Sequence, residues 1–295
     1  SRNEPDKKEK LTNYYGPIVS RYTIDQALDE NVLCPYDYYP YQIYLDDEEC
    51  YEYEEISNDI GKKFAIESNN KKSEDNTALE ALYARRARLL GSLSEKFNLL
   101  EKLISQKNKQ HYVLVYCGDG STELDSEGTN KRDIELAGQI LHAAGWSVSK
   151  ITADESENAR REIIRQFANG DINALAAIRV LDEGFDLPLC REAYFLASSR
   201  NERQFIQRRG RILRQSSSKE AARINDFIAT SGGWNTTECF IKLVYSELCR
   251  GYEFARVARN RVEALGVLER IAKEHRIDFK LLITDEEEKY EQENG

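Results

Sequence analysis

Residues 112–117 read Tyr-Val-Leu-Val-Tyr-Cys, and residues 174–178 and 193–197 read Ala-Leu-Ala-Ala-Ile and Ala-Tyr-Phe-Leu-Ala. Each is a short, almost wholly apolar run, which is typical of a strand buried on both faces. Further apolar runs and amphipathic stretches alternate with them, at 133–144, 147–152, 157–168, 203–211 and 223–229. Short buried strands that alternate with helices predict an α/β domain with a doubly wound parallel sheet over 112–229.

Amphipathic and polar stretches flank this predicted sheet. Between residues 77 and 106 apolar residues recur at helical spacing, which predicts one long amphipathic helix or two. The Tyr-rich region before it predicts extended segments around a short helix at 24–30, then a polar loop at about 67–76. We divide the chain into an N-terminal connector (1–76), the α/β domain (77–230) and a helical extension that ends in an acidic tail (231–295).

The composition excludes several classes of protein. With 42 Lys and Arg against 52 Asp and Glu, the formal net charge is −10, so any nucleic-acid contact has to be a local patch. The six cysteines lack CxxC spacing and only three histidines are present, so we expect reduced thiols and no bound metal. No apolar run approaches the roughly 18 residues of a membrane helix and no signal peptide opens the chain, so we expect a soluble, cytoplasmic protein with no membrane partner.

The stretch QFIQRRGRILR at 204–214 concentrates positive charge just after the apolar run at 193–197. It is predicted to open a helix at the carboxyl edge of the sheet, where ligand-binding residues of open α/β sheets gather. Arg211 and Arg214 are three residues apart and therefore share one helical face. Guanidinium groups placed in this way suit a transferring phosphoryl group. The alternative is a surface helix whose arginines form ordinary salt bridges.

Three motifs in a fixed order resemble the C-terminal RecA-like domain of superfamily 2 helicases of the DEAD/DEAH-box type, in its bacterial form. Residues 204–214 are similar to motif VI of that family, residues 178–188 (IRVLDEGFDLP) to motif V, and residues 112–117 to the strand of motif IV. Residues 153–171 resemble the family's helix that ends in a Phe, small residue, Gly-Asp turn. The resemblance covers roughly residues 95–230 and implies a RecA-like fold.

The resemblance implies roles for individual residues. Gln207 would touch the phosphates of a nucleotide, and Arg211 and Arg214 would be arginine fingers that reach ATP held by a partner domain. Gly184 and Asp186 of motif V would lie near the ATP ribose and the cleft between the two domains. For Asp186 the alternative is a carboxylate that only caps its own loop.

One position departs from the family's pattern. Motif V often starts with Thr or Ser, and here Ile178 and Arg179 take that place. Arg179 is the candidate for a direct contact with a nucleic-acid phosphate, although the hydroxyl contact of the family is missing.

The sequence contains no GxxxxGK[ST] phosphate loop and no acidic DExx strand end. In the family these elements belong to the first RecA-like domain. The resemblance therefore implies that ATP and Mg²⁺ are held mainly by a first domain outside this chain, and that DNA or RNA is the other partner. We expect the second motor domain of an ATP-hydrolysing helicase, inactive by itself. The alternative is a non-catalytic module that keeps the fold to bind nucleic acid or protein.

The C-terminal region carries further arginines on a predicted helix, with Tyr252 and Phe254 between them. They are Arg250, Arg256, Arg259 and Arg261. They either grip a phosphate backbone together with the aromatic residues, or face water while Phe254 packs against the core. For Cys117, a buried thiol at a strand end is the expectation, and a reactive thiol is the alternative.

Overall fold

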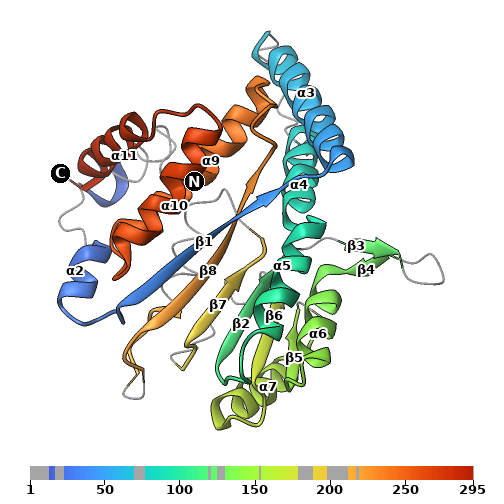
Figure 1. Ribbon diagram of the computed structural model, residues 1–295, viewed down its shortest axis with the longest axis vertical. Coiled ribbons are helices and arrows are strands. Elements are labelled where there is room, and N and C mark those ends of the chain that lie inside the picture. The colour runs from blue at the N-terminus through green and yellow to red at the C-terminus, as the bar shows by residue number, and fades with distance from the viewer. Residues whose placement is uncertain are drawn as a thin grey trace.

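The computed structural model describes residues 13–16, 23–69, 77–118, 121–124, 130–152, 154–178, 189–197, 212–216 and 219–294. In these residues six strands form one sheet, in the order β1-β8-β7-β2-β6-β5 (Figure 1). They are β1 (Tyr36–Tyr44), β2 (Val113–Cys117), β5 (Val148–Ile151), β6 (Ala174–Ile178), β7 (Glu192–Phe195) and β8 (Ala222–Thr230). Every neighbouring pair is parallel, which confirms the predicted parallel sheet.

Helices cover both faces of the sheet, as a doubly wound fold requires. Alternate residues of β2 separate two cores, because successive side chains of a strand point to opposite faces. Val113 and Val115 belong to the core that includes residues of α5 (Ser94–Ser105) and α6 (Asp133–Ala143). Leu114 and Tyr116 belong to the other core. The helices on that side are α7 (Glu157–Asn169), α9 (Glu238–Ala255) and α10 (Arg261–Glu274).

The region before β2 is more regular than its polar sequence indicates. The short helix expected at 24–30 is α2 (Ile24–Asp29), and the stretch 77–106 forms two helices, α4 (Thr77–Gly91) and α5. A further helix, α3 (Asp47–Asn69), runs three residues into the stretch predicted as a loop. The rest of that predicted loop lies outside the described residues.

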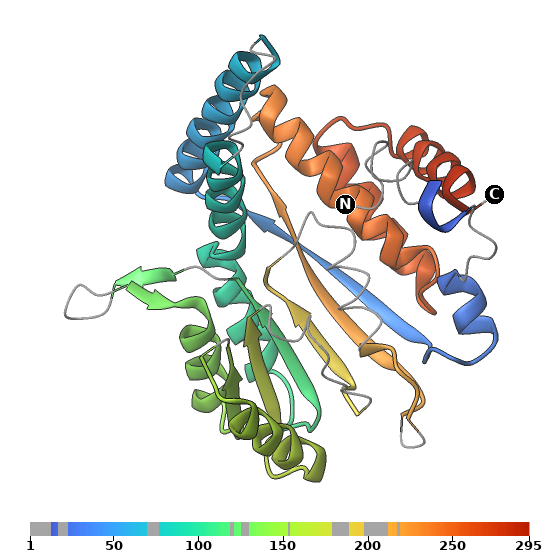
Figure 2. The same ribbon diagram turned by 180° about the vertical axis from the view of Figure 1, so that it is seen from behind.

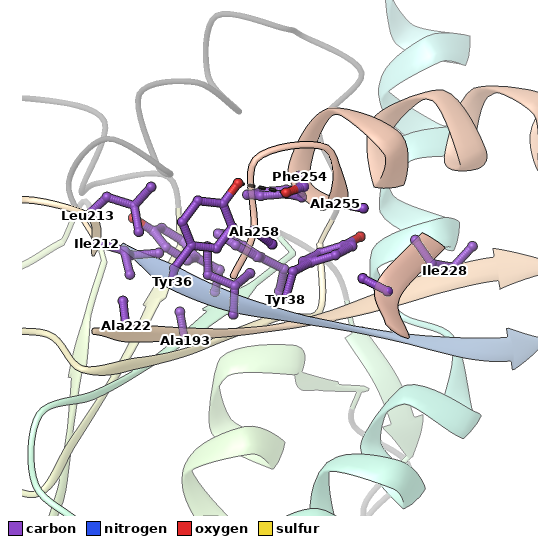
Figure 3. Close-up of a cluster of buried hydrophobic side chains, with 14 of the residues drawn as sticks. Tyr36, Tyr38, Ala193, Ile212, Leu213, Ala222, Ile228, Phe254, Ala255 and Ala258 are labelled. Atoms are coloured by element: carbon purple, nitrogen blue, oxygen red, sulfur yellow. Dashed lines mark hydrogen bonds between the residues drawn. The ribbon is translucent and has the colours of Figure 1, made fainter. Parts of the chain in front are cut away.

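The strand β1 comes from the predicted connector and occupies an edge of the main sheet. It pairs with β8 along its whole length, from Tyr36 beside Ala222 to Tyr44 beside Thr230. Its side chains enter the core: the Tyr36 hydroxyl donates to the Phe254 carbonyl at 2.7 Å, and the Tyr38 ring stacks on that of Phe254 (Figure 3). The sheet therefore extends into residues 1–76, while the three-part division of the chain stays a prediction.

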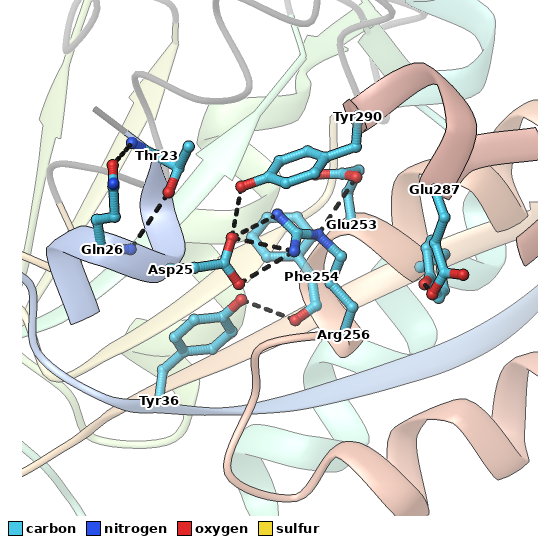
Figure 4. Close-up of polar contacts among 10 residues, drawn as sticks. Thr23, Asp25, Gln26, Tyr36, Glu253, Phe254, Arg256, Glu287 and Tyr290 are labelled. Atoms are coloured by element: carbon cyan, nitrogen blue, oxygen red, sulfur yellow. Dashed lines mark hydrogen bonds and ion pairs between the residues drawn. The ribbon is translucent and has the colours of Figure 1, made fainter. Parts of the chain in front are cut away.

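The two ends of the described chain meet beside α9. The Arg256 guanidinium binds the Asp25 carboxylate of α2 at 3.1 Å, and the Tyr290 hydroxyl donates to that carboxylate at 2.6 Å (Figure 4). Tyr290 lies on α11 (Phe279–Asn294), so the predicted acidic tail is largely a helix. Burial raises the pKa of Asp25, but the Tyr290 hydrogen bond and Arg256 outweigh it and hold the pKa below its usual value. These contacts fix the helical extension to the N-terminal region.

A small hairpin stands apart from the main sheet. Its strands β3 (Ser121–Leu124) and β4 (Asn130–Arg132) are antiparallel. The hairpin extends away from the sheet between β2 and α6 (Figure 2). Within the described ranges no helix is long and apolar enough to cross a membrane.

Candidate nucleotide and nucleic-acid site

The stretches with the predicted motifs V and VI follow β6 and β7, the two strands on either side of β2. Ile178 at the end of β6 pairs with Cys117 at the end of β2, and Phe195 at the end of β7 pairs with Tyr116. Residues 179–188 come between β6 and β7 in the sequence, and β2 lies between these two strands in the sheet. Such a switch point, at the carboxyl ends of parallel strands, is where open α/β sheets bind ligands.

The predicted site residues themselves lie mostly outside the described part of the chain. These are Arg179, Gly184, Asp186, Gln207 and Arg211. The helix expected at 203–211 also falls there. Their predicted roles stay predictions, and the structure places only the strand ends from which their segments depart.

Arg214, the sixth predicted site residue, is described and exposed. Its backbone forms an antiparallel bridge with Leu33, and the Cys34 amide donates to the Leu213 carbonyl at 2.6 Å. The next residue, Pro35, accepts from the amide of Ala222 where β8 begins. Arg214 therefore lies toward the end of the sheet where β1 and β8 start, opposite the carboxyl edge.

A buried lysine holds the segment that ends the predicted motif VI. Lys219 is 5% exposed, and its ammonium donates to the carbonyls of Ile212 at 2.6 Å and Cys190 at 3.1 Å. Cys190 lies just before β7. A single side chain thus ties the chain after residue 211 to the amino end of a central strand.

A tight approach of two backbones shapes the carboxyl edge at the end of β2. A Cβ on Gly118 would lie 3.4 Å from the Gly91 Cα and 3.2 Å from Oδ2 of Asp133. Ser92 donates to the same Oδ2 at 2.6 Å, and the Asp133 side chain is fully buried at the start of α6. The absence of a side chain at Gly118 lets the strand end pass beside the junction of α4 and α5.

Lys96 links that junction to the end of β7. Its ammonium is fully buried and donates to the carbonyls of Leu90 at 2.6 Å and Leu196 at 2.5 Å. Burial lowers the pKa of Lys96 to about 8. Leu196 lies one residue from the described end of this segment at residue 197, so Lys96 helps to position the chain that leads toward the predicted motif VI.

From the sequence we did not identify three buried charged residues near the site, namely Lys96, Asp133 and Lys219. Lys96 is four residues before Leu100 and three after Leu93, so it falls on the apolar stripe of its helix. A charged residue at a core position was the available signal. Lys219 and Asp133 follow no such pattern, because each is buried by contacts with elements distant in the sequence.

The C-terminal arginines follow the second interpretation only in part: Arg261 is exposed and the Arg259 side chain is 51% exposed, but Arg250 and Arg256 do not face water. Arg250 is buried and pairs with Asp226 and Glu247, and Arg259 pairs with Asp37. Arg256 pairs with Asp25, as described above. These guanidiniums are committed to structural ion pairs, while Phe254 packs in the core as expected.

The cysteines, and the carboxylates in the described part of the chain, are candidates for metal ligands and reactive groups. Cys117 is buried at the end of β2, which confirms the expectation of a buried strand-end thiol, and burial raises the pKa of that thiol. All six cysteines are free. Over the described ranges no three His, Cys, Asp or Glu side chains come together as ligands.

Comparison with known proteins identifies the central part of the chain. Residues 95–216 match the helicase conserved C-terminal domain. This part of the chain is therefore a RecA-like C-terminal domain of the superfamily 2 helicase type. The match contains β2, β5, β6 and β7, from whose ends the predicted motifs depart.

Individual relatives are helicases, translocases and Dicer-like proteins. The chain is 30% identical over 162 residues to the DNA 3'-5' translocase XPB2 of Sulfurisphaera tokodaii, covering 54% of this chain and 32% of that protein. It is 32% identical over 174 residues to Dicer-like protein 2 of Cryphonectria parasitica, covering 57% of this chain and 12% of the relative. The chain thus spans a third or less of the length of these two relatives.

Solved structures show a looser likeness. The C-terminal part of the Fun30 ATPase domain superposes with a TM-score of 0.46 at 15% identity, covering 67% of this chain and 86% of that one. The Pyrococcus furiosus Hef helicase domain superposes with a TM-score of 0.44 at 15% identity, covering 77% of this chain and 62% of that one. The family assignment rests on the sequence match.

Proposed function

We propose that this chain is the second motor domain of an ATP-dependent DNA or RNA helicase or translocase. One observation carries the proposal. Residues 179–188 follow β6, and the segment after residue 197 follows β7. These two strands flank β2 in a helicase C-terminal domain, so their carboxyl ends lie at one edge of the sheet. Gly118 ends the strand between them. An edge of this kind suits contact with a ligand held partly by another domain.

In this proposal Arg211 and Arg214 act as arginine fingers and Gln207 contacts the nucleotide phosphates. Gly184 and Asp186 lie near the ribose. Arg214 is exposed, but its backbone is tied to Leu33 just before β1, away from the carboxyl edge, so its part in the proposal rests on the resemblance of residues 204–214 to motif VI.

ATP and Mg²⁺ would be held mainly by a first RecA-like domain. The sequence has no phosphate loop, and the described residues contain no group of carboxylates that could ligate a metal ion. When bound, MgATP supplies the phosphoryl group whose transfer drives movement. This chain would then contribute the positive charge of Arg211 and Arg214 to the bound nucleotide. Arg179 would contact the nucleic acid. We also place the protein in the cytoplasm, in keeping with its free thiols.

The test is nucleic-acid-stimulated ATP hydrolysis by the full-length parent protein, beside this chain alone and beside the parent with Arg214→Ala. We expect stimulated turnover by the parent, none by this chain, and a loss of about 10³-fold or more in the variant, since an arginine finger acts in the transition state. Nucleic-acid affinity should change little. A parent that binds nucleic acid but never hydrolyses ATP would favour the non-catalytic binding module instead.

A further inference from the structure

Trp234 is a large aromatic side chain left in water. It lies in the loop between β8 and α9 and is 76% exposed. The only other tryptophan, Trp146, is 2% exposed in the core. Trp234 thus leaves in water a ring whose burial would be strongly favourable, and an indole pairs a large apolar face with one N–H donor, which suits it to a contact surface.

The loop is built in a way that presents this ring. A Cβ on Gly232 would lie only 2.3 Å from the indole Nε1, so the pyrrole edge of Trp234 packs on the glycine backbone. The Asn235 amide donates to the Gly232 carbonyl at 2.8 Å, and the Asn235 side chain accepts from the Thr237 hydroxyl at 3.2 Å. The indole is thus supported along one edge while most of it stays exposed.

The loop is also anchored to the sheet. A Cβ on Gly233 would lie 2.9 Å from Cγ of Glu274 at the end of α10. Glu274 accepts in turn from the Tyr44 hydroxyl at 3.0 Å and from the Gln42 amide at 3.0 Å, both on β1. A ring held on a fixed loop loses little freedom when a ligand covers it.

The position of Trp234 relates it to the candidate site. Phe195 of β7 pairs with Asp226, and β8 continues four residues further to Thr230. Since all strands of the sheet are parallel, the loop that carries Trp234 lies at the same end of the sheet from which residues 179–188 depart.

We propose that Trp234 is a stacking platform for a nucleobase of single-stranded DNA or RNA that passes along the carboxyl edge of the sheet. The inference rests on the nucleic-acid binding of the proposed function and adds a specific subsite to it. An exposed indole stacks on any base without hydrogen-bond readout, and bases of a single strand are free to unstack from their neighbours. The chain is net acidic, so a neutral aromatic contact also avoids repulsion between like charges.

The two tryptophans allow a direct test, because Trp146→Phe leaves Trp234 as the single indole. Homopolymeric deoxythymidine and uridine oligonucleotides of about 20 nucleotides, long enough for one binding site, are titrated while tryptophan emission is recorded. We expect the emission of Trp146→Phe to be quenched, and that of Trp234→Leu, which keeps only the buried indole, to stay constant. The same oligonucleotides with an end label report affinity independently through fluorescence anisotropy.

In the anisotropy assay Trp234→Leu should raise the Kd by about 5- to 100-fold, and Trp234→Phe should keep most of the affinity. The salt dependence of the Kd should not change, because no phosphate contact is lost. Val262→Ala, at a residue that is 88% exposed on α10, is the matched control and should bind like the wild type.

The experiment distinguishes failure of the stacking subsite from failure of the proposed function. If the wild type binds the oligonucleotides and Trp234→Leu binds equally well, the stacking subsite is wrong and the proposed function stands. If neither single strands nor duplexes bind to this chain at all, the stacking subsite fails, while ATP hydrolysis by the full-length parent still tests the proposed function separately. Quenching by a fully paired duplex as strong as by a single strand would overturn the choice of a single-stranded ligand.

Discussion

At the scale of single residues, Lys96 is a buried ionisable group beside the end of β7, and its charged form is disfavoured by burial. Glu247, Arg250, Asp226 and Asp133 are the charged groups that act on it. Burial lowers its folded-state pKa to about 8, from a usual value of 10.5. Between these two values the unfolded chain binds a proton that the folded chain does not, so stability contributed by Lys96 rises with pH over this window.

Lys96→Met should remove this dependence on pH. The free energy of unfolding of the wild type minus that of the variant should rise by up to about 3 kcal/mol between pH 8 and 10.5. Urea unfolding at a series of pH values measures it. Lys102→Met, at an exposed lysine of the same helix, is the control. A difference that stays flat above pH 8 would show that Lys96 remains charged in the fold.

We expect the positive charge of Arg179 to strengthen nucleic-acid binding through contact with a phosphate. Arg179→Ala should weaken binding at low salt and reduce the slope of log Kd against log salt by about one, because one phosphate contact is lost. Fluorescence anisotropy over a range of salt concentrations measures both. An unchanged slope would count against a phosphate contact.

At the scale of elements, we expect alanine substitutions at two helical glycines to change the stability in opposite directions. A Cβ on Gly251 of α9 would lie 2.8 Å from the Leu268 side chain of α10, and Leu268 is fully buried. A Cβ on Gly266 of α10 would meet no atom within 4 Å. Gly251 thus sets how closely α9 and α10 pack.

Gly251→Ala should therefore lower the stability by about 1–3 kcal/mol, because the added methyl overpacks the helix contact. Gly266→Ala should raise it by up to about 1 kcal/mol, through helix propensity alone. Thermal unfolding followed by circular dichroism compares the two. Equal melting temperatures for both variants would contradict this account of the α9–α10 contact.

At the scale of the whole molecule, the N-terminal region is part of the folding unit. A fragment of residues 77–295 lacks β1, so β8 loses one of its two parallel partners and the core loses Tyr36 and Tyr38. We expect this fragment to lack a cooperative unfolding transition and to bind a hydrophobic dye. A fragment of residues 23–295 should unfold like the whole chain. Cooperative unfolding of 77–295 would instead support a domain boundary at residue 76.

The local patterns of the sequence determined much of this architecture. The apolar runs became β2, β6 and most of β7, because strands covered on both faces favour apolar side chains at every position. Helical spacing likewise identified α5 and α7, and the order of the motifs identified the helicase C-terminal domain that the family match confirms. Each of these features depends on residues close together in the chain.

Only the tertiary structure decided where distant segments meet. The pairing of β1 with β8 joins residues nearly two hundred positions apart, and the Tyr-rich sequence of β1 does not name its partner. The burial of Lys96 and the ion pairs of Arg250 and Arg256 have the same origin. A side chain's spacing indicates which face of its helix it occupies, but whether that face meets water, a carboxylate or a carbonyl depends on the elements packed against it, and those contacts form only when the whole sheet assembles.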